Sequence, residues 1–344
     1  MSELLKQFRK DLRHLFLGAL WSAWTDLGVA GGGPGSAQGM VDPEALLLLT
    51  LEIGREDPRL FDEVLDWLRK NGEWINVTRL GNVLRKDRLC DPSILSAVAA
   101  LLAEHDSSPK WRSLAGKSGG KGTSSASLFL RDGRPIGTSL ASADPRFEAR
   151  GWLRSPVHLR GMSQPPDLHA PAAFMLRCRA FFGLNIRADA WAYLMMNRHG
   201  TASRMARELG YTQPRVQEAV SGMHKAGAFH VRQDGNRKEF LAIPGRGWPE
   251  PEIEQQTGSW RNWRAYALSV TAVWRRAHTM KESGVTQYIL DAELSSVVQA
   301  NRNHFAAAGM TVADKSGAAD VLQALGTFSP LPAGLPANGS RGET

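Results

Sequence analysis

Residues 201–243 decide the fold that this sequence predicts, and they read TASRMARELGYTQPRVQEAVSGMHKAGAFHVRQDGNRKEFLAI. Apolar residues at helical spacing predict one short helix before Gly210 and a second helix that ends at Gly227. Thr212 stands at the N-cap position of the second helix, where its hydroxyl can accept from a free backbone N–H in the first turn. Pro214 is tolerated in that turn because no amide donor is needed there. The pattern predicts a helix-turn-helix.

A hairpin pattern follows the second helix. Phe229 and Val231 alternate with polar residues up to Asp234-Gly235, a dipeptide typical of tight hairpin turns, and apolar residues return over 240–243. Two helices, a turn and a two-stranded wing together predict a winged helix. A helix-turn-helix commonly serves to bind DNA, with its second helix in the major groove.

The second helix has an inner and an outer face in this prediction. Val216 and Val220 belong to the inner face, which packs on the first helix. Glu218 lies on the outer face, where phosphates repel its carboxylate unless it accepts from cytosine or pairs with a neighbouring base. Side chains on the outer face and its rim are able to bond to base edges or phosphates: Thr212, Gln213, Arg215, Gln217, Ser221 and Lys225. On the wing, the residues suited to phosphate or minor-groove contact are Arg232, Asn236, Arg237 and Lys238.

The distribution of charge favours nucleic acid as the partner. The chain of 344 residues has a formal net charge of +8 and a pI of about 9.7. Residues 171–246 contain 12 Lys and Arg but only 5 Asp and Glu, so this segment carries +7 of the +8. A positive excess confined to one segment is typical of a protein that binds phosphates. We therefore expect double-stranded DNA as the partner.

Residues 212–240 resemble the recognition helix and wing of bacterial transcriptional regulators of the ArsR/MarR type. The positions that match the family pattern are Thr212, Gln213, Pro214, Val216, Val220, Met223, Gly227, Gly235 and Phe240. The resemblance extends over residues 171–246 and implies a homodimer on an operator, with the recognition helix in the major groove and the wing on the flanking groove. Helix 202–209 lacks the cysteine pair of the metal-sensing members, so metal sensing through that helix is not expected.

Composition and cap signals divide the chain into five predicted segments of a mainly α protein. They are an N-terminal helical domain (1–105), a linker with a short hairpin and a Pro-rich connector (106–170), the winged helix-turn-helix domain (171–246), C-terminal helices (257–327) and a disordered tail (328–344). Asp42-Pro43 and Asp57-Pro58 each predict a capped helix start in the first segment. The helix layout of residues 58–105 repeats the layout of 187–226, so the segment fits either a degenerate winged helix or a plain helical bundle.

Two long helices are predicted after the wing. Trp260, Trp263, Val270 and Trp274 recur at helical spacing on the first, and the second covers 285–308. An aromatic stripe of this kind is typical of a protein core or a dimer seam. Because these apolar stripes exceed what one winged helix needs, we expect a homodimer.

The sequence predicts a cytoplasmic protein without a membrane span. A basic stretch before the apolar run 15–21 superficially resembles a signal peptide, but Glu3 and Asp11 interrupt the basic part, and the run is far too short to cross a bilayer. An amphipathic helix is expected there. Cys90 and Cys178 are far apart in sequence and are expected to be free thiols in a reducing compartment.

The sequence lacks the motifs of common enzymes. No G-x-S-x-G elbow is supported, because GKSGG at 116–120 lies in a Gly/Ser/Lys-rich linker with no apolar strand before it. No dinucleotide fingerprint and no paired-histidine site is supported either, so we expect no catalytic residues, no metal and no cofactor. Asp57, Asp62, Glu63 and Asp66 lie among arginines and predict a solvated face. We expect a sequence-specific DNA-binding transcriptional regulator rather than an enzyme. The alternative is a protein-interaction or antitoxin-like operon-partner subunit, whose winged helix docks a protein.

Overall fold

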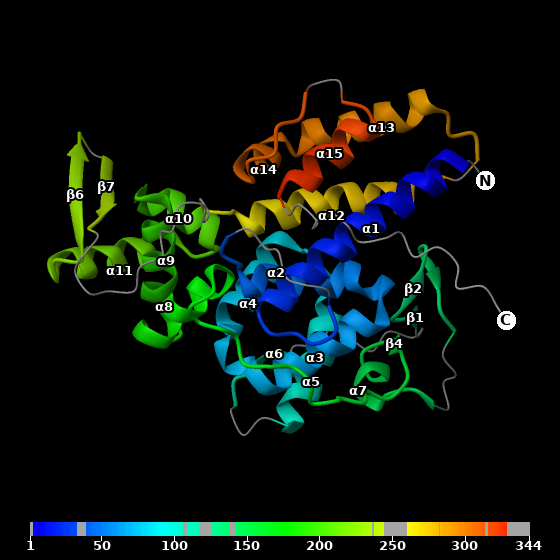
Figure 1. Ribbon diagram of the computed structural model, residues 1–344, viewed down its shortest axis with the longest axis horizontal. Coiled ribbons are helices and arrows are strands. Elements are labelled where there is room, and N and C mark those ends of the chain that lie inside the picture. Colours follow the sequence, from blue (N-terminus) through cyan, green and yellow to red (C-terminus); the bar gives the residue numbers. More distant parts are fainter. Residues whose placement is uncertain are drawn as a thin grey trace.

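Helices make up most of the protein, as the sequence predicts. The computed structural model describes residues 3–32, 39–105, 109–116, 126–137, 142–235, 237–243, 260–281, 283–313 and 316–328. Within these ranges, strands form one three-stranded and two two-stranded sheets, all of them small. Five helices of the N-terminal part form a bundle at the centre of the molecule (Figure 1). They are α1 (Glu3–Asp26), α2 (Pro43–Ile53), α3 (Pro58–Asn71), α4 (Val77–Asp87) and α5 (Pro92–His105).

Aspartate caps start two helices of this bundle, as predicted. The Asp42 carboxylate accepts from the backbone N–H groups of Glu44 and Ala45, at 3.2 and 3.1 Å, and Asp57 caps α3 in the same way. A proline follows each aspartate, where its missing N–H leaves no helix hydrogen bond unmade. Most of α5 is buried, and no strand lies among the described residues of 3–105, which favours the plain helical bundle over a degenerate winged helix.

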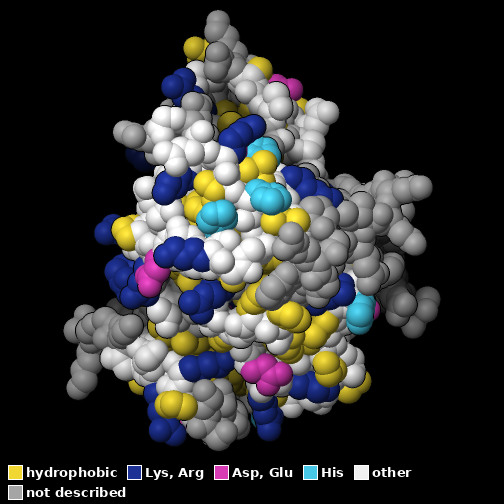
Figure 2. Space-filling view, turned by 90° about the vertical axis from the view of Figure 1, so that its left-hand side faces the viewer, with side chains coloured by type: hydrophobic (Ala, Val, Ile, Leu, Met, Phe, Trp, Pro, Cys, Tyr) yellow, Lys and Arg dark blue, Asp and Glu magenta, His cyan; other side chains and the backbone are white. Residues whose placement is uncertain are grey.

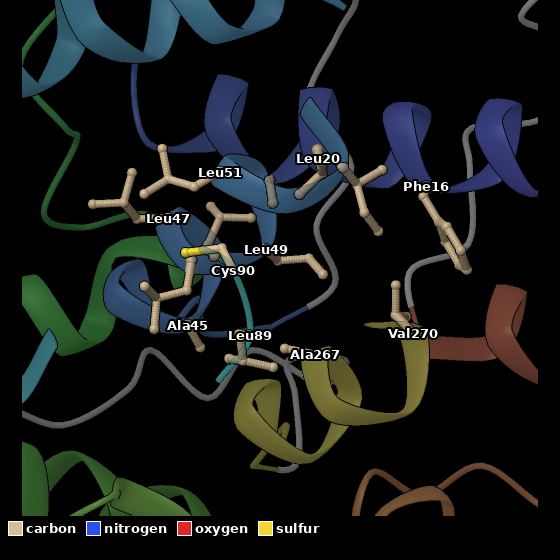
Figure 3. Close-up of a cluster of buried hydrophobic side chains, with 14 of the residues drawn as sticks. Phe16, Leu20, Ala45, Leu47, Leu49, Leu51, Leu89, Cys90, Ala267 and Val270 are labelled. Carbon is tan, nitrogen blue, oxygen red and sulfur yellow. The ribbon is translucent and has the colours of Figure 1, made fainter. Parts of the chain in front are cut away.

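Four helices at the C-terminal end complete the same core. They are α12 (Trp263–Thr279), α13 (Gln287–Ala300), α14 (Arg302–Ala307) and α15 (Ala318–Phe328). α12 packs on α1 and α2, and Figure 3 shows Phe16, Leu49 and Val270 of these three helices in one apolar cluster. The stripe of Trp263, Val270 and Trp274 is therefore core within a single chain. The apolar stripe of α12 therefore does not support the predicted homodimer.

The C-terminal helices differ from the prediction in their boundaries. Trp260 precedes α12 rather than belonging to it, because the Asn262 side chain caps the helix by accepting from a first-turn N–H at 3.0 Å. The single helix predicted over 285–308 is broken at Asn301. The Asn301 side-chain amide donates to the Val297 carbonyl at 2.9 Å and so competes with the helix backbone for that acceptor.

Phe328, which we expected in a disordered tail, ends α15. Its ring stacks on Tyr266 of α12 with centroids 3.9 Å apart, and the Trp263 ring packs edge-on against it with centroids 5.2 Å apart. Phe328 is thus part of the core, and the tail prediction is wrong at this position. The rest of the predicted tail, 329–344, lies outside the described residues.

The Pro-rich connector lies extended against α3. The Asp66 carboxylate accepts from the backbone N–H groups of Gly161 and Ser163, at 2.6 and 3.0 Å. Asp62 and Glu63 each pair with an arginine of the connector. Because an extended segment cannot bond to its own backbone, Asp66 satisfies the backbone N–H of buried Ser163, which would otherwise be unpaired. Glu63 and Asp66 are only 4% and 3% exposed, so the predicted solvated face is wrong.

The linker region contains two small sheets. β2 (Leu130–Arg131) and β3 (Arg134–Pro135) pair antiparallel around Asp132-Gly133, which confirms the predicted hairpin. β1 (Ala126–Ser127) pairs in parallel with β4 (Trp152–Leu153). Two short helices complete this region, α6 (Arg112–Ala115) and α7 (Pro145–Glu148).

Cys90 and Cys178 are free and buried, as predicted. Burial raises the pKa of both thiols, which favours their protonated form. Among the described helices, none combines the length and the apolar character needed to cross a membrane.

A second, smaller group of elements projects from one end of the bundle (left in Figure 1). It encloses its own apolar core, which includes Trp191, Leu209 and Phe229. We call this group, residues 174–242, the distal unit. Its elements are α8 (Phe174–Phe182), α9 (Ile186–Asn197), β5 (His199–Thr201), α10 (Ala202–Leu209), α11 (Gln213–Lys225), β6 (Phe229–Asp234) and β7 (Arg237–Ala242).

Candidate nucleic-acid interface

Two helices of the distal unit lie where the sequence predicts a helix-turn-helix. Thr201 is the N-cap of α10, and its side chain accepts from Arg204 N at 3.2 Å. Gly210 follows the last helical residue and has a φ of +78°. A side chain at position 210 would be strained in that conformation, and its Cβ would lie 2.6 Å from Val83 of α4. Glycine is therefore needed both to turn the chain between α10 and α11 and to let the turn approach the bundle.

α11 packs its inner face on α10, as predicted, and also on α9. Val216 and Val220 are fully buried. Thr212 occupies the predicted N-cap position, but its hydroxyl makes no capping hydrogen bond, so that part of the prediction is wrong. An N-cap side chain accepts from the N–H of the second or the third helical residue. Pro214 is the second residue of α11 and has no N–H, so only the N–H of Arg215 is left as a donor. Thr212 is exposed, and its hydroxyl is available to a ligand.

The outer face of α11 carries the side chains that the sequence assigns to base contacts. Gln217 and Ser221 are partly buried, and Gln217 Nε2 donates to Ser221 Oγ at 2.8 Å. This bond holds the two polar side chains together across one helical turn. The other outer-face residues are exposed: Gln213, Arg215, Glu218 and Lys225.

The sheet of the distal unit has three strands rather than the predicted two. β7 pairs antiparallel with β6 and also with β5, which lies between α9 and α10. β5 was not predicted, because three residues are too few to show an alternating pattern. Gly200 at its centre lets the strand pass Tyr193, whose ring would lie 2.8 Å from a Cβ at that position. Asn236, between β6 and β7, lies outside the described residues, and Arg237 is described in its backbone alone.

Ion pairs on this sheet already engage some of the charged side chains that were predicted to contact phosphate. Glu239 of β7 bonds to His199 of β5, with Oε1 and Nδ1 2.8 Å apart, and to Arg232 of β6. These hydrogen bonds hold the pKa of the Glu239 carboxyl below its usual range. The bond to His199 has the largest effect, and the bond to Arg232 has the next largest. Arg232 is therefore exposed but already paired. Lys238 is also exposed, and its ammonium pairs with no carboxylate among the described residues.

Two of the acidic side chains of the distal unit are buried and paired with arginines. Asp189 and Glu208 are 0% and 6% exposed, and they accept from Arg179 and Arg204 respectively. Figure 2 shows the outer end of the molecule, where Lys and Arg side chains are spread across the face and acidic side chains are few. A surface of this kind attracts polyanions.

Besides Arg204, which pairs with Glu208, three exposed arginines of the distal unit were not among the predicted site residues. Arg187 lies in the first turn of α9, Arg198 follows α9 with a φ of +67°, and Arg207 lies in the last turn of α10. The signal that could have identified Arg207 is its place on the polar side of a strongly amphipathic helix. In a helix-turn-helix the first helix crosses the DNA backbone, so a cation on that side is well placed to contact phosphate.

A buried ionic network ties the distal unit to the bundle. The Arg179 guanidinium donates to both carboxylate oxygens of Glu44 in α2, at 2.8 Å each, and to Asp189 of α9 at 2.9 Å. Arg79 of α4 pairs with the same Glu44 and donates through Nε to the Leu209 carbonyl at 2.7 Å. The four charged groups are at most 2% exposed. The end of α10 is therefore held directly by the bundle.

The described part of the chain contains no group of three or more His, Cys, Asp or Glu side chains arranged to bind a metal ion. Comparisons of the chain with models of known protein families, with curated proteins and with solved structures found no match. The geometry and charge of the distal unit are therefore the observations that bear on function.

Proposed function

We propose that residues 186–242 form a winged helix-turn-helix and that the protein is a sequence-specific DNA-binding transcriptional regulator. The order helix, strand, helix, helix, strand, strand, with β5 bonded to β7, supports the winged-helix assignment. One observation carries the function: the outer face of α11 exposes polar and basic side chains beside a hairpin that also exposes cations. A helix that projects such a face from a positive surface suits the major groove of DNA.

In this proposal, the side chains of α11 contact base edges. Gln217 can bond to adenine through two hydrogen bonds and Arg215 to guanine, while Ser221 suits either base. Because Gln217 donates to Ser221 in the free protein, the two side chains enter the groove as one polar pair. Glu218 restricts the preferred sites to those that offer the amino group of cytosine, since its carboxylate is otherwise repelled. Gln213 adds a further amide in the first turn.

Phosphate contacts position the protein and supply much of its affinity. Thr212 and Lys225, at the two ends of α11, are proposed to contact the backbone on either side of the groove. Arg232 contributes less than its exposure suggests, because Glu239 already holds it. The other proposed contacts of the wing are Asn236, Arg237 and Lys238.

A homodimer remains part of the proposal through the resemblance to ArsR/MarR-type regulators, although the stripe of α12 no longer supports it. A two-fold pair of distal units would place two α11 helices roughly 34 Å apart, on half-sites one helical turn apart. Light scattering with and without DNA tests this part. A monomer near 37.7 kDa under both conditions contradicts it.

An alternative function is supported by one apolar feature of the distal unit. Phe181 is 55% exposed and Leu184 is 38% exposed, where α8 ends and before α9 begins. Apolar side chains grouped on a surface are typical of a protein-interaction site. In this alternative, the protein is an antitoxin-like operon-partner subunit whose distal unit docks a protein.

The salt dependence of binding separates the two functions. In fluorescence anisotropy with a labelled duplex, DNA binding should weaken steeply with salt, with a slope of about 0.9 for each phosphate contact. Lys225→Ala should lower that slope by about 0.9, whereas Arg69→Ala, at an exposed position of α3, should leave it unchanged. If the folded protein binds no duplex at low salt, the DNA-binding proposal is wrong and the protein partner is favoured.

A further inference from the structure

A polar cavity lies where the distal unit meets the C-terminal helices. It has a volume of about 460 Å³ and is lined by residues of α10, α12 and α14. α10 belongs to the distal unit, and both α10 and α14 pack on α12 (Figure 1). The described residues that line the cavity are Arg207 of α10, Asn262, Arg264, Ala265 and Leu268 at the start of α12, and Asn303, His304 and Ala307 of α14.

One of the two lining arginines is already engaged. Arg264 Nη2 donates to Asp87 Oδ1 of α4 at 2.7 Å, and the same guanidinium donates to the backbone carbonyl of Arg207. The side chains of Arg264 and Asp87 are only 7% and 5% exposed. Because these two charges neutralise each other, Arg264 shapes the cavity without adding net charge to it.

Arg207 supplies the free positive charge of the cavity. Its side chain is exposed, and its guanidinium has no carboxylate partner in the described part of the chain. None of the described lining residues is acidic. Burial lowers the pKa of the His304 imidazole, so this ring is neutral at pH 7. The cavity therefore carries one uncompensated positive charge at neutral pH.

Three further side chains of the cavity have hydrogen-bonding groups that the protein leaves unused. Asn262 is only 5% exposed, and its Oδ1 accepts from Ala265 N at 3.0 Å, which leaves its amide nitrogen without an acceptor among the described residues. Asn303 and the ring of His304 also make no side-chain hydrogen bond within those residues. A buried donor without an acceptor is unfavourable, so Asn262 would gain from an acceptor in the cavity.

The rest of the wall is aliphatic. Ala265 is buried, Leu268 is partly buried and Ala307 is exposed at the edge of the cavity. An apolar wall with a few converging polar groups is typical of small-molecule sites, and the volume lies within their range. The cavity therefore suits a molecule with one polar, negatively charged end and an aliphatic remainder.

We propose that this cavity binds a small organic acid that has one carboxylate and an aliphatic part. A guanidinium group such as that of Arg207 can donate two parallel hydrogen bonds to a carboxylate. The single negative charge matches the single uncompensated cation, which a phosphate dianion would exceed. The unused amide of Asn262 adds a donor from the buried side. Binding of the acid does not depend on the proposed DNA binding, because it is measured on the protein alone.

Saturation-transfer NMR titrations of the full chain with hexanoate test the required charge. Hexanoate should bind saturably, whereas hexanamide, which has the same chain length and no charge, should bind at least tenfold more weakly. Arg207→Gln should weaken hexanoate binding about tenfold. Arg187→Gln is the matched control, because Arg187 is an exposed arginine of α9 that does not line the cavity, and it should leave the affinity unchanged.

A second pair of variants tests the location of the site. Ala306 and Ala307 are both exposed on α14, but only Ala307 is among the described residues that line the cavity. Ala307→Leu should reduce hexanoate binding because the larger side chain fills part of the cavity, whereas Ala306→Leu should bind as the wild type does. Circular dichroism checks the fold of each variant.

Four results would overturn this proposal. They are the absence of saturable hexanoate binding, equally tight binding of hexanamide or of inorganic phosphate, wild-type affinity in Arg207→Gln, and equal affinities of Ala306→Leu and Ala307→Leu. Each of them is obtained without DNA, so each is distinct from a failure of the DNA-binding proposal.

Discussion

The Tyr211 hydroxyl donates to Asp189 Oδ2 at 2.6 Å, within the ionic network that joins the distal unit to the bundle. Tyr211 belongs to the turn between α10 and α11, and Asp189 belongs to α9. Arg179 bonds to the same carboxylate and carries the connection on to Glu44 of α2. The orientation of α11 is thus set by charged groups of the bundle as well as by the apolar core of the distal unit.

Loss of one arginine from this network should destabilise the chain. Arg179→Met leaves Asp189 and Glu44 buried with less positive charge, and breaking a buried ion pair by removing one partner costs about 3–5 kcal/mol. Arg187→Met, at an exposed position of α9, is the matched control and should change the free energy of unfolding by less than about 0.5 kcal/mol. Urea denaturation followed by circular dichroism measures both values. Equally small effects would show that the network does not hold the distal unit.

Three of the four tyrosines should resist ionisation while the chain is folded. Burial raises the pKa of Tyr193, Tyr211 and Tyr266. The unfolded chain ionises these phenols near a pKa of about 10, so above that pH it binds fewer protons than the folded chain. Their contribution to stability is complete below about pH 10 and is lost as the pH rises further.

Near-ultraviolet absorbance of tyrosinate tests this prediction during an alkaline titration. We expect no more than one tyrosinate per chain until circular dichroism reports unfolding. Two or more tyrosinates in a chain that retains its native spectrum would show that the buried phenols are accessible to base.

Removal of the wing carboxylate should strengthen DNA binding. In Glu239→Gln, Arg232 loses its charged partner and becomes available to phosphate, so affinity for any duplex should rise and the salt slope should steepen by about 0.9. Glu148→Gln removes an exposed charge from α7, far from the wing (Figure 1), and should leave both values unchanged. Anisotropy titrations at several salt concentrations measure the slope. An unchanged slope in Glu239→Gln would mean that Arg232 does not reach the DNA backbone.

Local sequence signals were sufficient for the elements that form the candidate site. Gly210, Pro214 and Asp234-Gly235 act within a few residues of the chain, and the turn, the helix and the hairpin that they predict are all present. The burial of Val216 followed from helical spacing in the same way. Such signals depend on backbone conformation and on the period of one element, and both are properties of a short segment.

Contacts between distant segments could not be predicted from these patterns. Asp62, Glu63 and Asp66 resembled a solvated face because their partners lie 92 to 97 residues later in the chain. The apolar stripe of α12 indicated that something covers it, but helical spacing cannot distinguish another helix of the same chain from a second copy.

The ion pairs of the candidate site could be predicted only in part. The ion pair between Arg232 and Glu239 joins neighbouring strands and could have been anticipated from the hairpin register. The contribution of His199 could not, because β5 is too short to be recognised and joins the sheet only through the tertiary fold.

Selection of binding sites from a random duplex pool, carried out with the wild type and with Gln217→Ala, tests the central claim most directly. The wild type should enrich one sequence, and the folded variant should bind that site about 1–3 kcal/mol more weakly, with relaxed preference at one base position. Val220→Asp is the folding control, because a buried unpaired charge should unfold the distal unit and abolish binding altogether. If the wild type enriches no sequence, or if folded Gln217→Ala enriches the same sequence with equal affinity, α11 is not the element that reads DNA.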